Sequence, residues 1–569
     1  MKLKQLASAV ILATSSIPAM AATYNLDLVP VQDKSFFNFA QSIDNTGTLV
    51  TVSESEYNPP IDLSLLNFDS EAFRAIFADP DAAEVGDFTN RDYQAVYSFI
   101  VTNRGRNDPT FQAIANYRSY QGDTVDAELI PGFDVIDDAT NDYTRSAFSI
   151  VNDSYSGQYF VGSGNTPFFK VDTLDSNDEE VTYVLNDTYR QAFVAVNGVT
   201  TPLPPTSPDM INGISEAFSI NSSLQVAGWG SSAYIESVNN NIELCFDDEE
   251  RGDVPIELCT YSLGLSLNEG SYRRAMIWQL DAQGNLLSTT EYGLLFEPEE
   301  DNNFVSFTSR ANAINDNGIA VGASHNGESV VYTLPAQQPT PRRDLQSVAT
   351  TFIDGETAEL LPENSDNLMS EAIDINNDNW VVGTVLQENN NIARNQLFLY
   401  NIDSGEEIYP QGFFQTAGVK PRAINNNGIV VGEGEFESQV QVDRELRAFM
   451  YDLNVGEFIN LNTLLTCEQR QKYTLVTAMD INDNNEIIAN ARVIDDQRYI
   501  TGEKVLNSAG ETNQIDRVVA VKLTPNSAGS VEQCEQAEEP KYERSGASAS
   551  WYGLAVLSVF ALMRRRLRR

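Results

Sequence analysis

The stretch Ala423–Gly432 reads AINNNGIVVG, and close copies of it recur along the chain. Ala313–Gly322 reads AINDNGIAVG, and Ile373–Gly383 reads IDINNDNWVVG. Asn-Gly and Asp-Asn-Gly turns accept the positive φ that tight hairpins need, and runs of Ile and Val suit buried strands. Each copy therefore predicts a strand, a tight turn and a second strand.

Weaker copies extend the pattern over most of the chain. They lie at Ser42–Val50, at Ser219–Gly228, at Asp480–Ala489 and, with an insertion, at Ser149–Asn152 with Tyr159–Gly162. A further strand built around Ala and an aromatic residue follows most copies, as in Arg447–Tyr451, Gln396–Tyr400, Arg274–Trp278, Gln191–Val194 and, more loosely, Tyr93–Tyr97 and Val330–Tyr332. With the polar turn and apolar pair that come next, one unit holds about four short strands.

The spacing of the copies predicts an all-β fold, a β-propeller of about seven four-stranded blades. The copies centre on Ile43, Ile150, Ile220, Ile314, Ile375, Ile424 and Ile481. The shortest spacing, 49 residues from Ile375 to Ile424, matches a blade of about 40 to 50 residues. We expect Tyr24–Val29 and Arg517–Leu523 to share one blade and so close the ring. A β-solenoid or stacked β-sandwiches are the alternatives.

Longer spacings require insertions. Asp69–Phe77 predicts a short helix capped by Asp69 or Ser70. Pro202–Pro208 and Pro335–Arg343 are expected to be proline-rich loops, and Asn239–Cys259 an acidic loop closed by a disulfide.

The two ends of the chain are typical of sorting signals. Residues 1–21 combine a basic start with an apolar run and predict a signal peptide cut after Ala21 or Ala22. The propeller then covers residues 22–525, and residues 526–550 form a polar linker. Residues 551–569 predict a short hydrophobic helix with an arginine-rich tail, which anchors the chain in the inner membrane with its body outside.

Composition excludes several functions. The chain has 569 residues, 81 acidic against 36 basic, for a net charge of −45. That field excludes a nucleic-acid binder that neutralises phosphates. His325 is the single histidine, so a multi-histidine zinc site cannot be built, and the motif SHNG suggests that it lies at a hairpin tip.

Four cysteines, Cys245, Cys259, Cys467 and Cys534, are an even number in a chain expected to be exported. They allow three pairings, of which we favour Cys245 with Cys259 and Cys467 with Cys534.

Two resemblances add to this reading. The motif Ser545, Gly546, Ala547 and Ser548, followed by the apolar run and the arginines, resembles the GlyGly-CTERM sorting signal, although it has one glycine rather than a pair. That resemblance implies retention, cleavage by a rhomboid-type protease and delivery to the cell surface. The internal copies resemble the HAF-type extracellular repeat, and the whole layout resembles uncharacterised secreted bacterial proteins known as a domain of unknown function. Neither supplies catalytic residues.

Each of the remaining candidate motifs has a structural interpretation as well as a functional one. Asp374–Asp378 and Asp480–Asn484 space oxygens as a calcium loop begins, but the later ligands are absent, so hairpin turns are favoured over calcium. The repeat aromatics are expected to pack between blades rather than form a carbohydrate platform; they are Phe193, Trp278, Phe398, Tyr400, Phe449 and Tyr451.

The sequence thus favours an exported, cell-surface or secreted scaffold that binds a ligand or partner without catalysis. The alternative is a polysaccharide hydrolase that uses two carboxylates. The implied partners are the export machinery, a rhomboid-type protease, and an extracellular glycan or protein. No cofactor is expected, calcium being the one candidate. The ligand itself is beyond the sequence.

Overall fold

The computed structural model describes residues 23–534 except positions 32, 139, 176–177, 207–210, 299–306, 337, 363, 365, 439–441 and 443. The chain divides into two compact units, residues 1–531 and 532–569, and every described strand and helix belongs to the first. The signal peptide, the sorting motif and the C-terminal hydrophobic helix predicted from the sequence lie outside the described residues.

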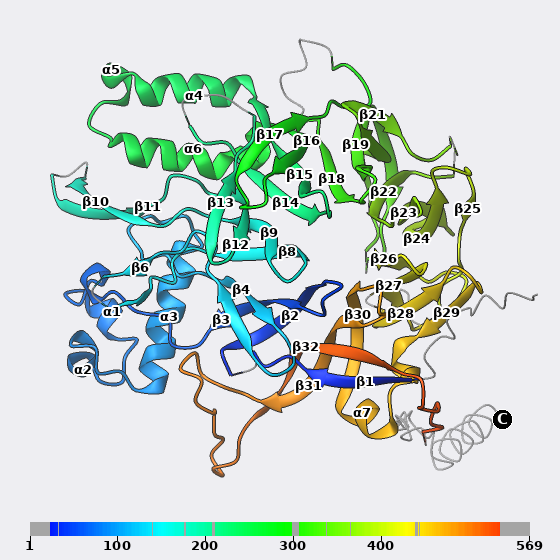
Figure 1. Ribbon diagram of the computed structural model, residues 1–569. Coiled ribbons are helices and arrows are strands. Elements are labelled where there is room, and N and C mark those ends of the chain that lie inside the picture. Colours follow the sequence, from blue (N-terminus) through cyan, green and yellow to red (C-terminus); the bar gives the residue numbers. More distant parts are fainter. Residues whose placement is uncertain are drawn as a thin grey trace, which may run out of the picture. The chain divides into compact units, whose positions relative to one another are not determined.

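Seven four-stranded antiparallel sheets form the blades of a β-propeller, which confirms the predicted fold (Figure 1). Blade 1 holds β2 (Ser35–Ile43), β3 (Leu49–Glu56), β4 (Tyr117–Gly122) and β5 (Ala127–Ile130). Blade 2 holds β8 (Ser149–Tyr155), β9 (Tyr159–Gly164), β12 (Gln191–Val196) and β13 (Val199–Leu203). Blade 3 holds β14 (Ser215–Ile220), β15 (Gln225–Tyr234), β16 (Ser271–Leu280) and β17 (Leu286–Glu291).

The other blades follow in chain order. Blade 4 holds β18 (Ser309–Ile314), β19 (Ala320–Thr333), β20 (Pro341–Ile353) and β21 (Glu356–Glu359). Blade 5 holds β22 (Met369–Ile375), β23 (Trp380–Asn389), β24 (Ile392–Asn401) and β25 (Glu407–Ile408). Blade 6 holds β26 (Val419–Ile424), β27 (Ile429–Glu435), β28 (Leu446–Asp452) and β29 (Glu457–Asn460).

Blade 7 joins the two ends of the propeller sequence. It holds β30 (Tyr473–Ile481), β31 (Ile487–Asp496), β32 (Gln514–Asn526) and, at its outer edge, β1 (Thr23–Leu28). β1 pairs antiparallel with β32, and Leu26 lies opposite Leu523. The predicted ring closure is therefore confirmed, and it removes the open sheet edges that an unclosed array would leave.

The glycine that ends most copies lets the second strand lie against the first. A Cβ at Gly432 would lie 2.2 Å from the Lys420 carbonyl oxygen and 2.8 Å from the Phe449 ring. Such approaches exclude any side chain. The inner strand also carries a β-bulge at this point, where the register shifts between Pro421 and Ala423.

Three details of the predicted repeat were wrong. In blade 2 the residue at the position of the repeat isoleucine is Ser154, not Ile150. Ser154 pairs with Phe160, as Ile220 of blade 3 pairs with Val226. Tyr93–Tyr97 lies in a helix rather than a strand, and Val330–Tyr332 belongs to β19, the second strand of its blade. Ile150 lies in the same strand as Ser154, whereas the other two segments belong to an insertion and to a long strand.

Most helices lie in insertions between the second and third strands. Blade 1 carries a 3-10 turn, η1 (Leu63–Leu65), and then α1 (Glu71–Arg74), α2 (Pro80–Glu84) and α3 (Asn90–Arg104). Ser70 caps α1 by accepting from the Phe73 amide, as predicted. Blade 3 carries α4 (Glu236–Phe246), α5 (Asp248–Arg251) and α6 (Ile256–Gly270), so the expected acidic loop at Asn239–Cys259 is instead helical.

Two small hairpins and a few short elements complete the described chain. They are β10 (Phe169–Leu174) with β11 (Glu180–Leu185), β6 (Ile136–Asp137) with β7 (Asp142–Tyr143), η2 (Leu461–Leu464) and α7 (Cys467–Lys472). Within the described ranges, no helix is long and apolar enough to cross a membrane.

The antiparallel order gives the propeller two different ends. Turns between first and second strands and between third and fourth strands lie at one end, which we call the turn face. Connections between second and third strands, and from one blade to the next, lie at the other end, the insertion face. The core lies between blades, where Phe193, Trp278, Phe398 and Phe449 are fully buried. Tyr451 is also buried and Tyr400 half-buried, so the packing interpretation of these aromatics is confirmed.

Candidate functional site

The Asn-rich turns link each blade to the next. The Asn425 side chain donates to the Asn482 carbonyl oxygen at 2.9 Å, and its Oδ1 accepts from the Ile429 amide at 2.9 Å within its own turn. The same donation runs from Asn221 to residue 315, from Asn315 to residue 376, from Asn376 to residue 425 and from Asn482 to residue 44. We call this series the asparagine ladder.

The ladder accounts for the motif that suggested calcium. Asn376 and Asn482 each use Oδ1 to accept two amides of their own turn, at 3.0 to 3.1 Å. Asp378 and Asp483 lie in the same turns, and Asp483 accepts from the Asn426 amide of the preceding blade. Among the described residues, no group of three or more His, Cys, Asp or Glu side chains could hold a metal ion. Calcium binding itself stays an untested prediction.

The ladder is interrupted at blades 1 and 2. Blade 1 has Asp44 at the ladder position, which accepts from the Gly157 amide of blade 2 but cannot donate as an amide does. Blade 2 has Tyr155 there, opposite Tyr159 in the hairpin. The contact between these two blades consequently differs from the others.

Three aspartates on the innermost strands form a second set of links; the sequence analysis considered Asp374 and Asp480 only as calcium ligands and missed Asp153 and the linking role of all three. Asp153, Asp374 and Asp480 occupy one repeat position in blades 2, 5 and 7, where the other blades have Ser or Ala. Each accepts an amide of its own strand and one of the next blade; Asp374 binds the Ile375 and Ile424 amides, both at 2.8 Å. The signal was an Asp at the same offset in several copies.

Because the innermost strands of a propeller surround its central channel, we call Asp153, Asp374 and Asp480 the channel aspartates. Burial raises the pKa of Asp374 and of Asp480 to about 7, and repulsion from Asp153 adds to both shifts. The pKa of Asp153 is raised by burial as well. Each of the three residues is half-buried. A carboxyl that titrates near neutral pH can serve as an acid catalyst, so Asp374 and Asp480 are the candidate carboxylates for hydrolysis.

His325 lies inside β19 opposite Ser347, not at a hairpin tip as expected. Its Nδ1 accepts from the Thr308 amide at 2.9 Å. Burial, together with Arg273, Arg310 and Arg274, lowers its pKa to about 4. A neutral imidazole with one ring nitrogen already occupied has a structural role here.

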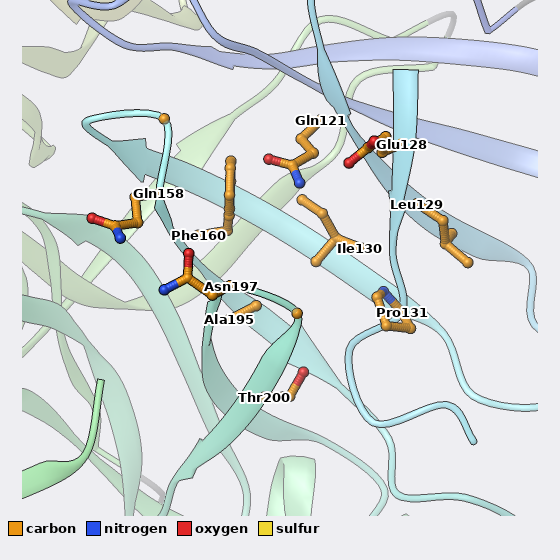
Figure 2. Close-up of a pocket in the computed structure, with 12 residues that line it drawn as sticks. Gln121, Glu128, Leu129, Ile130, Pro131, Gln158, Phe160, Ala195, Asn197 and Thr200 are labelled. Carbon is orange, nitrogen blue, oxygen red and sulfur yellow. The ribbon is translucent and has the colours of Figure 1, made fainter. Parts of the chain in front are cut away.

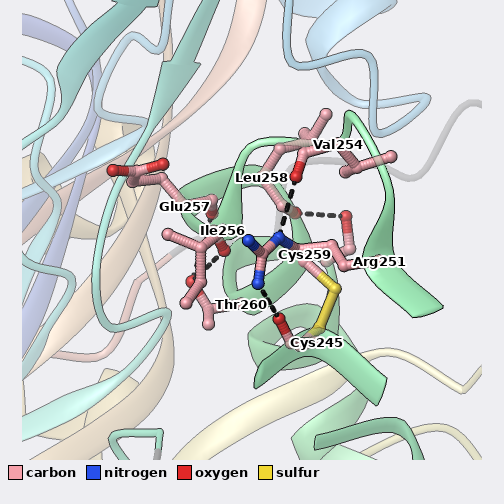
Figure 3. Close-up of a disulfide and its surroundings, with 9 residues drawn as sticks. Cys245, Arg251, Val254, Ile256, Glu257, Leu258, Cys259 and Thr260 are labelled. Carbon is pink, nitrogen blue, oxygen red and sulfur yellow. Dashed lines mark hydrogen bonds between the residues drawn. A yellow bond between two sulfur atoms is a disulfide. The ribbon is translucent and has the colours of Figure 1, made fainter. Parts of the chain in front are cut away.

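Cys245 and Cys259 are disulfide-bonded, with Cα atoms 5.7 Å apart, and join α4 to α6 (Figure 3). The Arg251 guanidinium lies beside the bond and donates to the carbonyl oxygens of Cys245 at 2.7 Å and Val254 at 3.1 Å. Cys467 and Cys534 are also disulfide-bonded, and no described cysteine is free.

The insertions of blades 7, 1, 2 and 3 join into one continuous structure on the insertion face, the insertion cap (residues 497–513, 57–116, 165–190 and 235–270). Arg104 of α3 is its centre: the guanidinium donates to the Val184 carbonyl oxygen at 3.0 Å and to the Tyr261 hydroxyl at 2.8 Å. It also lies 5.0 Å from the Phe168 ring centre, and burial lowers its pKa. Gln94 Oε1 of α3 accepts from the Ile500 amide at 2.7 Å and so links the insertion of blade 7 to that of blade 1.

A cavity of about 570 Å³ lies within the insertion cap and beside β6–β7. Tyr143, Phe168 and Phe169 line it together with the charged groups Arg145, Lys170, Asp62 and Asp142. Lys170 pairs with Asp62 at 2.6 Å, and Arg145 donates to the carbonyl oxygens of Tyr57 and Asn58 at 3.1 and 3.2 Å. The volume lies within the range of about 300 to 1,000 Å³ typical of ligand sites.

A buried ion network holds one wall of this cavity. Arg118, 2% exposed, pairs with Glu56 at 3.2 Å and with Asp134 at 3.1 Å, and its guanidinium lies 5.5 Å from the Tyr143 ring centre. Asp134 in turn accepts from the Arg145 amide at 3.0 Å, where Arg145 has a left-handed φ of 53°. Strained backbone that is held by its surroundings is common at functional sites.

A second cavity of about 370 Å³ opens on the turn face between blades 1 and 2, where the ladder is interrupted (Figure 2). We call it the turn-face groove. It is bounded by Gln121, Glu128, Gln158, Phe160, Asn197 and Thr200 together with neighbouring apolar residues.

The predicted signal cleavage site at Ala21 and Ala22 and the sorting motif at Ser545–Ser548 lie outside the described residues, so those predictions stand untested.

The chain is thus a seven-bladed propeller whose insertion face carries the insertion cap. The chain belongs to the family described as protein of unknown function (DUF3466), which matches residues 1–566. No curated protein is significantly similar to it. Among solved structures, prolyl oligopeptidase B from Galerina marginata, bound to a 35mer hydrolysis and macrocyclization substrate, is 10% identical with a TM-score of 0.30. The likeness covers 88% of this chain and 65% of that one, less than two thirds of its length. It carries no argument about function.

Proposed function

We propose that this protein is exported and acts as a non-enzymatic scaffold that captures an extracellular glycan or protein partner with its insertion cap. The observation that carries the proposal is the placement of the insertions: four neighbouring blades extend the same connection, at the same end, into one cross-linked structure. Connections held on a rigid framework are where binding residues concentrate. The turn face, by contrast, consists mostly of short turns joined by the asparagine ladder.

Export is supported by the basic and apolar N-terminus and by cysteines that are all disulfide-bonded, because disulfides persist in oxidising compartments. In this proposal the C-terminal tail holds the body at the inner membrane, facing the periplasm, until a rhomboid-type protease releases it to the surface.

Site-specific photo-crosslinking in whole cells tests the proposal. A crosslinker replaces Leu244 on α4 of the cap, 48% exposed, or Val455 on the turn face, 62% exposed, as the matched control. We expect an envelope partner to be captured through position 244 and not through position 455. Equal capture at both positions, or adducts only with cytoplasmic proteins, would contradict the proposal.

A polysaccharide hydrolase is the second candidate, favoured by the raised pKa of Asp374 and Asp480. The test is release of reducing sugar from soluble polysaccharides by the wild-type protein and by Asp374→Asn and Asp480→Asn. Loss of a measurable activity in both variants with an unchanged melting temperature would support catalysis. Absence of activity in the wild type would reject it.

A further inference from the structure

The turn-face groove exists because blade 2 combines a two-residue turn between its third and fourth strands, which blade 4 also has, with the loss of the ladder asparagine, which blade 4 keeps as Asn315. In blades 1 to 6 the inner turn joins the first and second strands, and the outer turn joins the third and fourth. In blades 3, 5 and 6 the outer turn folds over the inner turn and donates one backbone hydrogen bond to it. The donors are the amides of Leu280, Ile402 and Leu453, and the acceptors are the carbonyl oxygens of residues 224, 379 and 428, at 3.0 to 3.1 Å. Blade 2 has only Asn197 and Gly198 between its paired residues Val196 and Val199. No residue is left to cover the inner turn, which also lacks the ladder asparagine.

Apolar side chains form the floor of the groove. Phe160, Ile130 and Ala195 are 4%, 3% and 5% exposed and belong to the core packed between blades 1 and 2. The floor is therefore rigid, and the space above it is not created by a mobile loop. Packing of this density holds a binding surface in one shape.

Polar side chains with free hydrogen-bonding capacity stand around this floor. Figure 2 shows Gln121 and Asn197 extending toward the same space from opposite sides, with Gln158 and Glu128 at the rim. Within the described part of the chain, none of these four side chains has a hydrogen bond or ion pair with another residue. Three carboxamides and one carboxylate thus face one space of about 370 Å³.

The chemistry of the lining selects the ligand. No Lys, Arg or His is among the residues that line the groove, so an anionic ligand would find no counter-charge. Carboxamides both donate and accept, as sugar hydroxyls do, whereas the apolar floor suits the C–H face of a sugar ring. We propose that the turn-face groove binds a neutral saccharide unit. This site lies at the opposite end of the propeller from the insertion cap and does not depend on the proposed function.

The test uses the full-length protein on an array of neutral, sulfated and uronic-acid oligosaccharides, followed by calorimetric titration of the neutral sugar bound. Asn197→Gly removes the amide yet tolerates the left-handed φ of 52° at this position. Asn390→Gly is the matched control, because Asn390 has a φ of 54° in the β23–β24 hairpin at the insertion face. We expect the dissociation constant to rise about tenfold in Asn197→Gly and in Gln158→Ala, and to stay unchanged in Asn390→Gly.

A second variant, Thr200→Trp, fills the groove and should abolish binding whatever the individual hydrogen bonds contribute. Melting temperatures within about 2 °C of wild type show that each variant is folded. Binding of charged sugars alone, no binding in the wild type, or wild-type affinity in Thr200→Trp would each overturn the proposal.

Discussion

Replacement of Asn425 by Ala tests whether the asparagine ladder holds the ring together. The side chain is 4% exposed and makes four hydrogen bonds. Two cap its own turn, from the amides of Asn427 and Ile429, and two reach the next blade, at the Asn482 carbonyl oxygen and Asn485 Oδ1. Alanine removes all four bonds; the Ile429 amide and the Asn482 carbonyl oxygen lose a buried partner, and the partners at Asn427 and Asn485 are half-buried.

A hydrogen bond contributes about 1 kcal/mol net, so we expect Asn425→Ala to lower the free energy of unfolding by about 4 kcal/mol. The assay is urea unfolding followed by fluorescence, with the midpoint and slope fitted together. The neighbouring Asn426→Ala is the control: Asn426 is exposed and makes two bonds, to the Asn377 amide and Asp483, so we expect a loss below about 1 kcal/mol.

Equal losses in the two variants, or a loss below about 1 kcal/mol in Asn425→Ala, would refute the reasoning. The first result would mean that burial does not matter at this position. The second would mean that water replaces the ladder bonds at little cost.

Three further predictions concern the channel, the blades and the insertion cap. Asp374 has a pKa of about 7, above its ordinary 3.8, so the folded state binds the proton more tightly than the unfolded state. The stability of the wild-type protein should therefore fall as pH rises from about 4 to 7. Urea titrations of Asp374→Asn should show a shallower fall over the same range. A Cβ at Gly432 would lie 2.2 Å from a backbone oxygen, so Gly432→Ala should unfold the protein or lower its melting temperature by more than about 10 °C. Gly264 lies in helix α6 with open space around it, so Gly264→Ala should be neutral or stabilising in the same thermal scan. Joint replacement of Cys245 and Cys259 by Ser, 14 residues apart, should cost about 3 kcal/mol locally, seen as faster proteolysis within α4–α6 and not within the blades.

Much of the framework could be predicted from the repeat alone. The turn residues, the β-branched runs and the closing glycine are local requirements of a hairpin, so Ala423–Gly432 already specifies two strands and the bend between them. Blade count and ring closure followed from the spacing of such copies. Prediction failed in two ways: Tyr93–Tyr97 has the composition of a blade strand but lies in α3 within an insertion, and the copy in blade 2 was placed on Ile150 rather than on Ser154 of the same strand.

The sites show the same division. The asparagines were singled out by their turns, but their donation to the next blade depends on residues about 50 to 100 positions away and left no local mark. Asp374 and Asp480 were noticed only as possible calcium ligands and Asp153 not at all among 81 acids; only the ring gives the three one shared role on the innermost strands. The turn-face groove arises from a two-residue turn in blade 2 together with the loss of the ladder asparagine, a combination that becomes a cavity only when the blades stand side by side.

The sequence by itself determined the repeated hairpin, the number of blades and the pairing of β1 with β32, because short-range turn chemistry and hydrophobic patterning act within a few residues. Tertiary structure alone decided which polar groups meet. The insertion cap converges on Arg104, and the channel aspartates share one axis, because ring closure brings distant copies into contact while burial sets the charge that each group carries.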